Sequence, residues 1–503
     1  MRFDRHILSI GLLIASLAYT LWFVFAGFGN HLDPLYWLYK YEHMEGGWMA
    51  VGTLLTGGAV VRLFGPELLP LRLAGWLCVT AAIALPYCTL LDRDTRRANL
   101  HWLALTYLLM GYGAFQEFSP GTLTVLLLSA IWVTTSKSPF LSALLAGLAI
   151  TVRFPNILVL LVLVPLWRKR TLWLLPVTAL TAGVVYLLGY LFITPAPMDA
   201  AMTSHELTSM LTKLWENLGK LLGFMLMAVG VLAFPLRGKR YAGWFVGAAL
   251  ALFILYSIKP YQWYNADLTY LLSAFCIVLA LCSPSMHVPP LKGRLGGALL
   301  LIATLGTDTA WLKLFPAVLC LLPVALSQFR EHSSRRYLLQ VLIILCAVVT
   351  FRMTTNSIAQ SNLTKATTLA SVSPYRGIAI RPAEQSRLLQ YKADYDSLTN
   401  DHMVNVLALG QELHLMRAVT GCDAARYNEF WANIFDSVYT AKYEPIIAAE
   451  RPVVFCSFSP MFKTRPSYTD RESRMEQMLR AHGYRAIDRS KYKYMIYIPQ
   501  SNE

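Results

Sequence analysis

Long runs of apolar residues, separated by short polar clusters, occupy the first 353 positions of the chain. The first run, from Ile7 to about Phe28, follows a charged start and is about twenty residues long, enough to span a bilayer. No small-residue cleavage site ends this run, so we expect an uncleaved first helix. Twelve further runs follow, at about 68–91, 100–116, 120–136, 139–152, 154–167, 171–193, 218–236, 241–258, 266–282, 295–305, 310–328 and 337–353. The pattern predicts an α-helical polytopic membrane protein with about 13 transmembrane helices.

The pattern changes after residue 353, where charge rises and the apolar runs shorten. Strands are predicted at 404–410, 452–458 and 492–498, and helices after the first strand through 419 and over 470–482. Alternating elements of this kind favour a small α/β domain. We therefore divide the chain into a transmembrane domain, 1–353, with a long first outside loop at 29–70, and a soluble α/β domain, 354–503.

Composition agrees with a membrane protein. The chain is 56% hydrophobic and 15% charged, whereas an ordinary soluble domain is roughly a quarter charged. A net charge of +15 would suggest a nucleic-acid partner in a soluble chain. Here the basic residues lie in clusters between apolar runs, as membrane topology demands, so we expect no nucleic-acid partner.

The basic residues also orient the chain. With a cytoplasmic N-terminus, 17 of the 44 Lys and Arg residues fall in inside loops, nine in outside loops and helix ends, and 18 after residue 353. Compact inside clusters, such as the one at 168–170, obey the positive-inside rule. An odd number of spans then places the C-terminal domain outside the cytoplasm.

The eight cysteines show no CxxC pair and no Cys/His spacing suited to zinc. Cys422 and Cys456 lie in the C-terminal domain, where an oxidising compartment would permit a disulfide if the fold brings them together. Their pairing stays open at this point.

The first outside loop, at 29–70, is too long for a simple connector. Asp33 lies where the first helix leaves the bilayer, and an aromatic run that includes Tyr36 follows, as suits a helix lying in the membrane interface. Two roles are open for Asp33. It is either a general base, because an unperturbed Asp is ionised at neutral pH, or a cap of that helix, with Pro34 in the first turn.

These features resemble the GT-C glycosyltransferases. An Asp shortly after the first helix, the aromatic interfacial segment, and the Leu-Phe-Gly and Leu-Arg-Leu entry to the second span are similar to the protein O-mannosyltransferases and the bacterial aminoarabinose transferases. The likeness continues at 118–124 and 151–156. Two positions depart from the family pattern. Gly121 stands where members commonly carry an acid, so Glu117 is the candidate substitute, and Asp33-Pro34 replaces the usual Asp-Glu pair.

The resemblance implies an inverting glycosyltransferase of the bacterial inner (cytoplasmic) membrane. It would move a sugar from a polyprenyl-phosphate donor to a lipid, glycan or protein acceptor on the outer side, without a metal or a cofactor. Asp33 and Glu117 are the catalytic candidates. An anionic leaving phosphate requires fixed cations, and the outside helix ends offer three: Arg72, Arg153 and Lys259. The candidate substrate contacts are Tyr36, Tyr261, Tyr264 and Asp308.

Structural roles compete with several of these assignments. Arg72 would also suit snorkelling to lipid headgroups, Lys259 and its neighbouring tyrosines an aromatic belt, and Asp308 a tight turn. Arg153, at the membrane edge, is more often functional. A polytopic transporter or lipid flippase of the cell envelope is the alternative function, although the sequence shows no convincing internal repeat.

Overall fold

The computed structural model describes residues 5–27, 33–47, 50–110, 118–195, 207–232, 239–257, 270–275, 277–278, 290–304, 314–329, 331–355, 363–399, 405–410, 413–420, 437–457, 476–492 and 494–500. The helices of the first 355 residues are α1 (Arg5–Phe25), α2 (Asp33–His43), α3 (Val51–Phe64), α4 (Leu68–Leu90), α5 (Arg93–Ala98), α6 (Leu100–Met110), α7 (Pro120–Thr134), α8 (Pro139–Val152), η2 (Phe154–Leu158), α9 (Val159–Trp167), η3 (Arg168–Arg170), α10 (Thr171–Phe192), α12 (Leu207–Leu232), α13 (Ala242–Ser257), α15 (Pro290–Leu301), η4 (Ile302–Thr304), α16 (Leu314–Ser327) and α17 (His332–Thr355). The later helices are η6 (Leu363–Lys365), α18 (Pro382–Thr399), α19 (Leu413–Thr420), α20 (Ser437–Glu450) and η8 (Ser490–Tyr492). The strands are β1 (Glu45–Gly46), β2 (Thr194–Pro195), β3 (Thr368–Leu369), β4 (Ala379–Ile380), β5 (Val406–Gly410), β6 (Val453–Ser457), β7 (Tyr484–Arg489) and β8 (Tyr494–Pro499).

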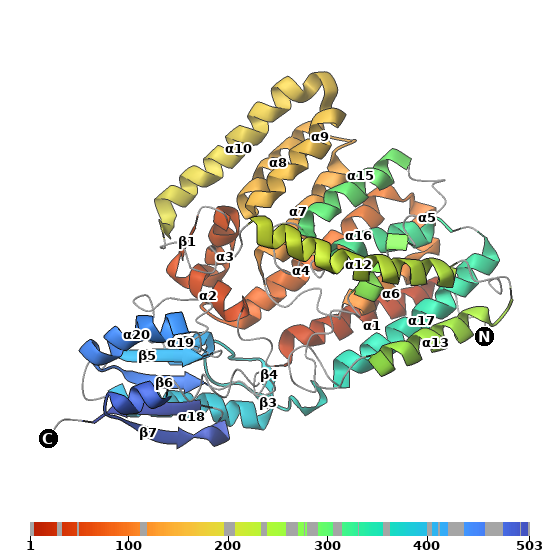
Figure 1. The fold of residues 1–503 in the computed structure, drawn as a ribbon. Coiled ribbons are helices and arrows are strands. Elements are labelled where there is room, and N and C mark those ends of the chain that lie inside the picture. The colour runs from red at the N-terminus through yellow and green to blue at the C-terminus, as the bar shows by residue number, and fades with distance from the viewer. Residues whose placement is uncertain are drawn as a thin grey trace.

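Apolar helices form most of the described chain (Figure 1). Within the described ranges, four helical stretches are long and apolar enough to cross a membrane, by length and composition: His6–Phe25, Leu68–Leu90, Phe154–Phe192 and His332–Phe351. Seven shorter apolar helices, of 10–17 residues, accompany them. All but one of these helices fall on predicted apolar runs, so the prediction of an α-helical protein with membrane-type helices is confirmed. The exception is Val51–Phe64, an apolar helix within the segment predicted as the first outside loop, 29–70. The number of 13 spans stays a prediction.

Capping residues explain two helix boundaries that the sequence predicts closely. The Ser119 hydroxyl accepts a hydrogen bond from the Thr122 amide at the start of α7, and Pro120 occupies the first turn. The same pairing of an N-cap serine with a following proline, at Ser138 and Pro139, opens α8. Both arrangements satisfy amides that a helix N-terminus leaves unpaired. As a result, the predicted run at 139–152 has the bounds of α8.

One end of the helical body carries the basic loops. The Arg96 guanidinium donates to the Cys88 carbonyl at 2.7 Å, and Lys137 Nζ donates to the last turn of α4 at 3.4 Å. Arg335 Nη2 donates to Asn99 Oδ1 at 2.6 Å and brings the start of α17 to the same end. These are loops that the positive-inside rule assigns to the cytoplasm.

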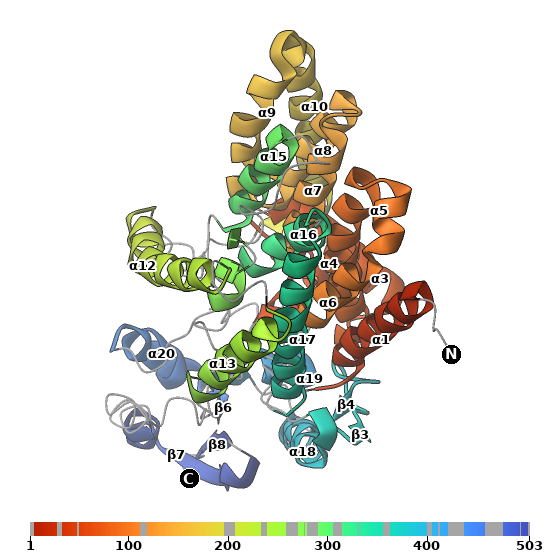
Figure 2. The same cartoon turned by 90° about the vertical axis from the view of Figure 1, so that its right-hand side faces the viewer.

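The opposite end of the helical body is joined to the C-terminal part. The backbone amides of Gly27 and Leu68 donate to the carbonyls of Ala379 and Pro374 at 2.8 and 2.9 Å. One hydrophobic cluster contains buried residues of α2, α3, α4, α18, α19 and the sheet. Figures 1 and 2 both show the strand-containing part at this end. The two parts of the chain therefore share a core.

The C-terminal part contains a four-stranded sheet with the order β5-β6-β8-β7. β5 pairs parallel with β6, and β8 pairs antiparallel with β6 and β7. Successive side chains of β6 point to opposite faces of the sheet, as the pleat requires. Phe455 packs with α18 and α19 on one face, and Val454 and Cys456 pack with α20 on the other. Cys422 lies outside the described residues, so its pairing with Cys456 stays open.

The strands predicted at 404–410, 452–458 and 492–498 are confirmed as β5, β6 and β8, and the helix predicted through 419 is α19. Of the helix predicted at 470–482, the structure describes a helical segment at 476–481. The sequence did not predict β7, α18 or α20.

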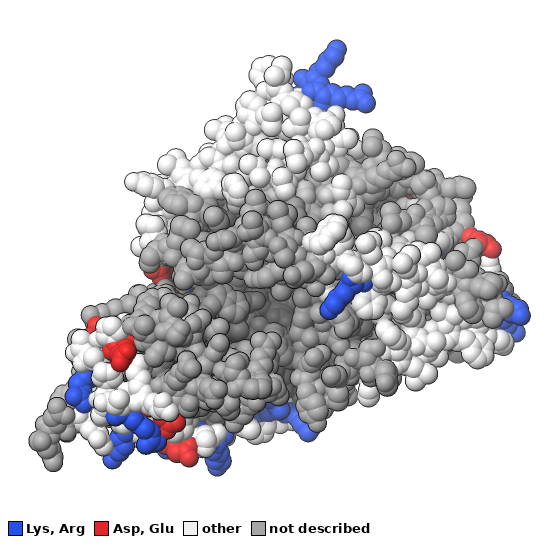
Figure 3. Space-filling view, in the orientation of Figure 1, with Lys and Arg blue, Asp and Glu red and all other residues white. Residues whose placement is uncertain are grey.

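The described surface of the helical body is largely apolar. In the view of Figure 3, described charged side chains gather over the C-terminal part and at the turn between α9 and α10, and few lie on the helical body between them. On α10, large apolar side chains are exposed, including Leu172, Trp173, Leu180 and Tyr190. Exposed apolar surface of this extent is rare on soluble monomers and suits contact with lipid.

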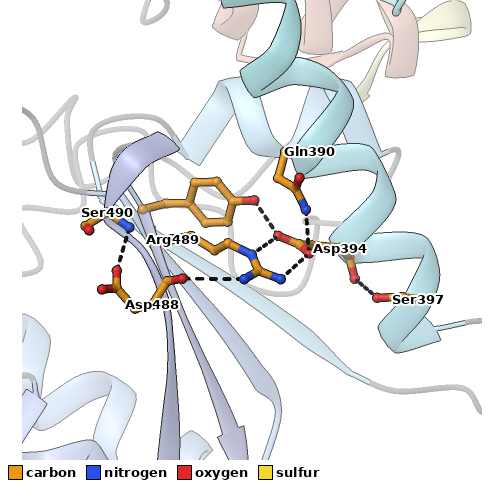
Figure 4. A network of polar contacts seen from close by, with 7 residues as sticks. Gln390, Asp394, Ser397, Asp488, Arg489 and Ser490 are labelled. Atoms are coloured by element: carbon orange, nitrogen blue, oxygen red, sulfur yellow. Dashed lines mark hydrogen bonds and ion pairs between the residues drawn. The ribbon is translucent and has the colours of Figure 1, made fainter. Parts of the chain in front are cut away.

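A buried carboxylate joins α18 to the β7–β8 hairpin (Figure 4). Arg489 donates twice to Asp394, from Nε at 2.8 Å and from Nη2 at 2.9 Å. The Tyr494 hydroxyl and the Gln390 amide complete the carboxylate's partners, at 2.5 and 2.9 Å. Every partner of the carboxylate among the described residues belongs to α18, β7 or β8, so this network is a structural clamp.

Asp394→Asn is expected to destabilise this clamp by about 3 kcal/mol, because it removes the charge that Arg489 and Tyr494 hold. Hydrogen exchange of the α18 and β7–β8 amides measures the loss. Asp396→Asn is the matched control: Asp396 pairs with Lys392 on the exposed side of the same helix, and exposed pairs are worth about 0.5 kcal/mol. Equal effects of the two substitutions would contradict the assignment.

The same clamp gives a pH dependence. Burial alone would raise the pKa of Asp394, but hydrogen bonds from Arg489, Tyr494 and Gln390 outweigh it and hold the pKa below its usual value. A carboxyl of this kind stabilises the fold above its unfolded pKa of about 3.9, and the contribution is lost as pH falls through the folded pKa. Exchange in α18, corrected for its intrinsic pH dependence, should therefore accelerate below about pH 4 in the unmodified protein and less in Asp394→Asn.

Candidate functional site

α2 is the helix that carries the predicted base. It begins at Asp33, so Asp33 and Pro34 form its first turn, as the sequence suggests. The Asp33 side chain lies outside the described part of the chain. Leu35, Leu38 and Tyr41 are buried in the core shared with α19 and the sheet. α2 is therefore held between the helical body and the C-terminal part.

Tyr41 connects α2 to the segment before α7. Its hydroxyl donates to the Phe118 carbonyl at 3.0 Å, and the Phe118 amide donates to the Leu71 carbonyl at 2.9 Å. The candidate Glu117 directly precedes Phe118 but lies outside the described residues. Tyr41 thus fixes the residue next to Glu117 against both α2 and α4.

Two glycines of α3 allow α2 to pack closely. A Cβ atom on Gly57 would overlap the Tyr41 ring, and one on Gly58 would overlap the Met44 sulfur. The Gly57-Gly58 pair therefore serves helix packing.

Gly57→Ala is expected to displace Tyr41 and to lower the stability of the protein by about 2 kcal/mol, because overpacking in a tight contact forces neighbouring groups to move. A thermal melt of the purified protein in detergent measures the change. Gly183→Ala, at a helical glycine of α10 with no atom within 4 Å of its added Cβ, should be neutral or slightly stabilising because alanine favours a helix. A neutral Gly57→Ala would refute the close contact.

Lys40 is a buried cation of α2 that the sequence analysis did not select. Its side chain is only 3% exposed, and Nζ lies 5.4 Å from the centre of the half-buried Tyr36 ring. Lysine is rarely buried unless it is paired. Asp33, Tyr36 and Lys40, spaced by three and four residues, share one face of α2, and the Lys40 side chain reaches one turn back along it. This spacing could have pointed to Lys40 in the sequence, but only if residues 33–43 were already known to form a helix.

Arg72, another candidate for holding the phosphate, is buried at the end of α1. Its Nη1 donates to the Gly27 carbonyl at 2.9 Å, and the residue is 6% exposed. The Gly27 amide also donates a hydrogen bond to the Ala379 carbonyl. Arg72 therefore braces the end of α1 where the C-terminal part docks.

Arg153 lies at the break between α8 and η2, on the same end of the body as α2 and α3. The Thr53 hydroxyl of α3 donates to the Val152 carbonyl at 3.1 Å and fixes this end of α8. Arg153 Nη1 donates to the Ala303 carbonyl of η4 at 3.2 Å. Its Nη2 is buried and has no hydrogen-bond partner among the described residues.

A second polar residue beside this break is also incompletely paired. The Asn156 amide donates to Thr124 Oγ1 at 3.0 Å and to the Ala149 carbonyl at 2.8 Å, whereas its Oδ1 is buried without a partner in the described structure. An unsatisfied buried donor or acceptor costs about 1–3 kcal/mol. Arg153 and Asn156 therefore each have one buried polar atom without a partner among the described residues.

The remaining candidates lie outside the described residues: Glu117, Lys259, Tyr261, Tyr264 and Asp308. Asp308 follows Ala303, the partner of Arg153, by five positions. No group of three or more His, Cys, Asp or Glu residues gathers within the described ranges. The expectation of a metal-independent reaction stays a prediction.

The helical end that faces the C-terminal part thus combines α2, with Asp33, Tyr36 and Lys40, and the α8–η2 break, with Arg153. The chain matches no protein-family model, and a comparison with curated proteins gives no significant match. The likeness to the GT-C enzymes therefore rests on the residues quoted for it.

Proposed function

We propose that the protein is a membrane glycosyltransferase that moves a sugar from a polyprenyl-phosphate donor to a lipid, glycan or protein acceptor. The chain crosses a bacterial inner membrane about 13 times in this proposal. The reaction takes place on the outer side, at the end of the helical body that faces the C-terminal α/β domain. The buried Arg153 guanidinium, with one nitrogen unpaired in the described structure, is the observation that carries the proposal.

The transfer is a single inverting displacement. The acceptor hydroxyl oxygen bonds to the anomeric carbon and its proton passes to the Asp33 carboxylate. The bond from that carbon to the phosphate oxygen breaks, and its electron pair leaves with the polyprenyl phosphate. A retaining route would need a second, nucleophilic carboxylate about 5 Å from the first, whereas the resemblance to the GT-C enzymes implies inversion.

Arg153 suits the leaving phosphate because a guanidinium binds phosphate oxygens through paired N–H donors. In a site that excludes water, a fixed cation stabilises charge as it develops. Arg72 is less suitable, since its guanidinium bonds the Gly27 carbonyl in the core. We therefore assign the phosphate to Arg153, together with Lys259.

α2 supplies the acceptor side of the proposed site. Asp33 and Tyr36 share a face with the buried Lys40, so a carboxylate, an aromatic ring and an ammonium group follow one another along the helix. An unperturbed aspartate is ionised at neutral pH, as a general base requires.

A polytopic transporter or lipid flippase is the alternative, because a buried Arg within the membrane also suits an anion pathway. Alternating access requires the outer end to open. Here that end is tied by the bonds from Gly27 and Leu68 to the C-terminal part and by a shared core. The transferase is therefore the better-supported proposal.

Reconstitution in liposomes separates the two functions. The purified protein is given a labelled polyprenyl-phosphate sugar, with and without extracted envelope acceptors. A transferase releases polyprenyl phosphate only when acceptor is present and labels that acceptor. Movement of the intact donor across the bilayer without acceptor, and without release, would favour the flippase.

A further inference from the structure

An open apolar groove lies between α12 and α13. It has a volume of about 480 Å³, within the range of small-molecule sites. All eight lining residues are apolar or glycine: Met227, Gly230 and Val231 of α12, and Phe245, Val246, Ala249, Leu250 and Phe253 of α13.

Packing explains why the groove is left unfilled. Gly243 and Gly247 bring α13 close to α17, where added Cβ atoms would meet Tyr337, Gln340 and Ile344. Phe245 projects from α13 and is 75% exposed. On the α12 side, a Cβ atom on Gly230 would have no atom within 4 Å. The described side chains of α12 and α13 therefore leave the space between the two helices open.

Two basic residues lie at the end of the groove. Lys239 and Arg240 are exposed and directly precede α13, and Arg240 lies over the Tyr241 ring at 5.4 Å. Gln340 of α17 donates to the Arg240 carbonyl at 2.9 Å, which places Arg240 at the basic end of the helical body. Exposed aromatic and basic side chains at a helix end are typical of the headgroup level.

The dimensions fit a lipid chain that begins at that level. From Phe245 to Phe253, α13 rises about 12 Å, close to the roughly 15 Å of one leaflet's hydrocarbon. A phosphate at Lys239 and Arg240 would therefore lie at the headgroup level while an attached acyl chain runs along the groove. One lipid molecule would therefore pair with the two basic side chains and cover the apolar lining of the groove.

We propose that the α12–α13 groove binds one acyl chain of an anionic phospholipid from the leaflet at the basic end, with Lys239 and Arg240 holding its phosphate. The site lies at the opposite end of the body from Asp33, and the inference is independent of the proposed transferase activity.

Native mass spectrometry of the full-length protein in detergent, titrated with phosphatidylglycerol or phosphatidylcholine, tests the proposal. Gly230→Phe fills the groove from α12 and should remove one tightly bound phosphatidylglycerol per chain. Lys239→Gln with Arg240→Gln should weaken that binding by about 25-fold, since each basic residue near a membrane surface contributes about fivefold. Phosphatidylcholine, whose ammonium group offsets its phosphate charge, should bind more weakly than phosphatidylglycerol and should respond less to the charge substitutions.

Two matched variants keep the test specific. Gly183→Phe adds the same side chain to an open glycine of α10, and Arg168→Gln with Lys169→Gln removes two exposed charges at the same end of the body. Both should retain the bound phosphatidylglycerol. The proposal is overturned if Gly230→Phe retains that lipid, if these controls lose it equally, or if phosphatidylcholine or a polyprenyl phosphate binds the groove as tightly as phosphatidylglycerol.

Discussion

Asp33→Asn is expected to lower the rate of sugar transfer by about 10²- to 10⁴-fold, the contribution typical of general acid–base catalysis. Asparagine retains an oxygen that can cap a helix about as well as aspartate does, but it cannot accept the acceptor proton. The substitution therefore removes the base and preserves the cap. Initial rates with a labelled polyprenyl-phosphate sugar, at equal amounts of folded protein, measure the effect.

Two variants of the same helix complete this experiment. Glu42→Gln removes an exposed carboxylate from α2 and should leave transfer unchanged. Asp33→Ala removes both the cap and the base, so it should lose about 1 kcal/mol of stability in addition to activity. Full transfer by Asp33→Asn, with loss of stability in Asp33→Ala alone, would show that Asp33 only caps α2.

Arg153→Met is expected to lower kcat/KM by about 10²- to 10³-fold, as loss of one preorganised donor to a developing anion does in other enzymes. Methionine retains the length of the aliphatic side chain, so packing at the α8–η2 break is largely preserved. Arg153→Lys should recover part of the activity, since it restores the charge without the paired donors.

Arg62→Met is the matched control for this loss, because Arg62 is exposed at the end of α3. It should transfer sugar at the unmodified rate. If Arg153→Met also transfers normally while its thermal stability falls, then Arg153 serves only to bond the Ala303 carbonyl.

Helix positions were predictable where the signal is local. α8 begins at a proline that follows an N-cap serine and ends just before Arg153, and all three residues are visible in the sequence. β6 is a short run of β-branched and apolar residues between turn signals, which favours a strand. β7 was missed because three of its six residues are charged, and it is held as an edge strand by β8 alone.

The environment of the candidate cations was less predictable. Arg72 bonds a carbonyl 45 positions away, and no local pattern encodes that contact. Lys40 is buried because α2 lies between α3, α4 and α19, and α19 lies more than 370 positions later in the chain. Arg153 was selected because an interruption between two apolar runs is visible in the sequence, but its unpaired Nη2 emerges only from packing.

Mass spectrometry of lipid-linked sugars in cells that lack the active protein is the most direct test of the central claim. The account predicts that a polyprenyl-phosphate sugar accumulates when the protein is absent. It also predicts that Asp33→Asn and Arg153→Met reproduce this accumulation and that Glu42→Gln and Arg62→Met do not. An unchanged pool of lipid-linked sugars in cells lacking the protein would contradict the assignment of the chain as a lipid-dependent glycosyltransferase.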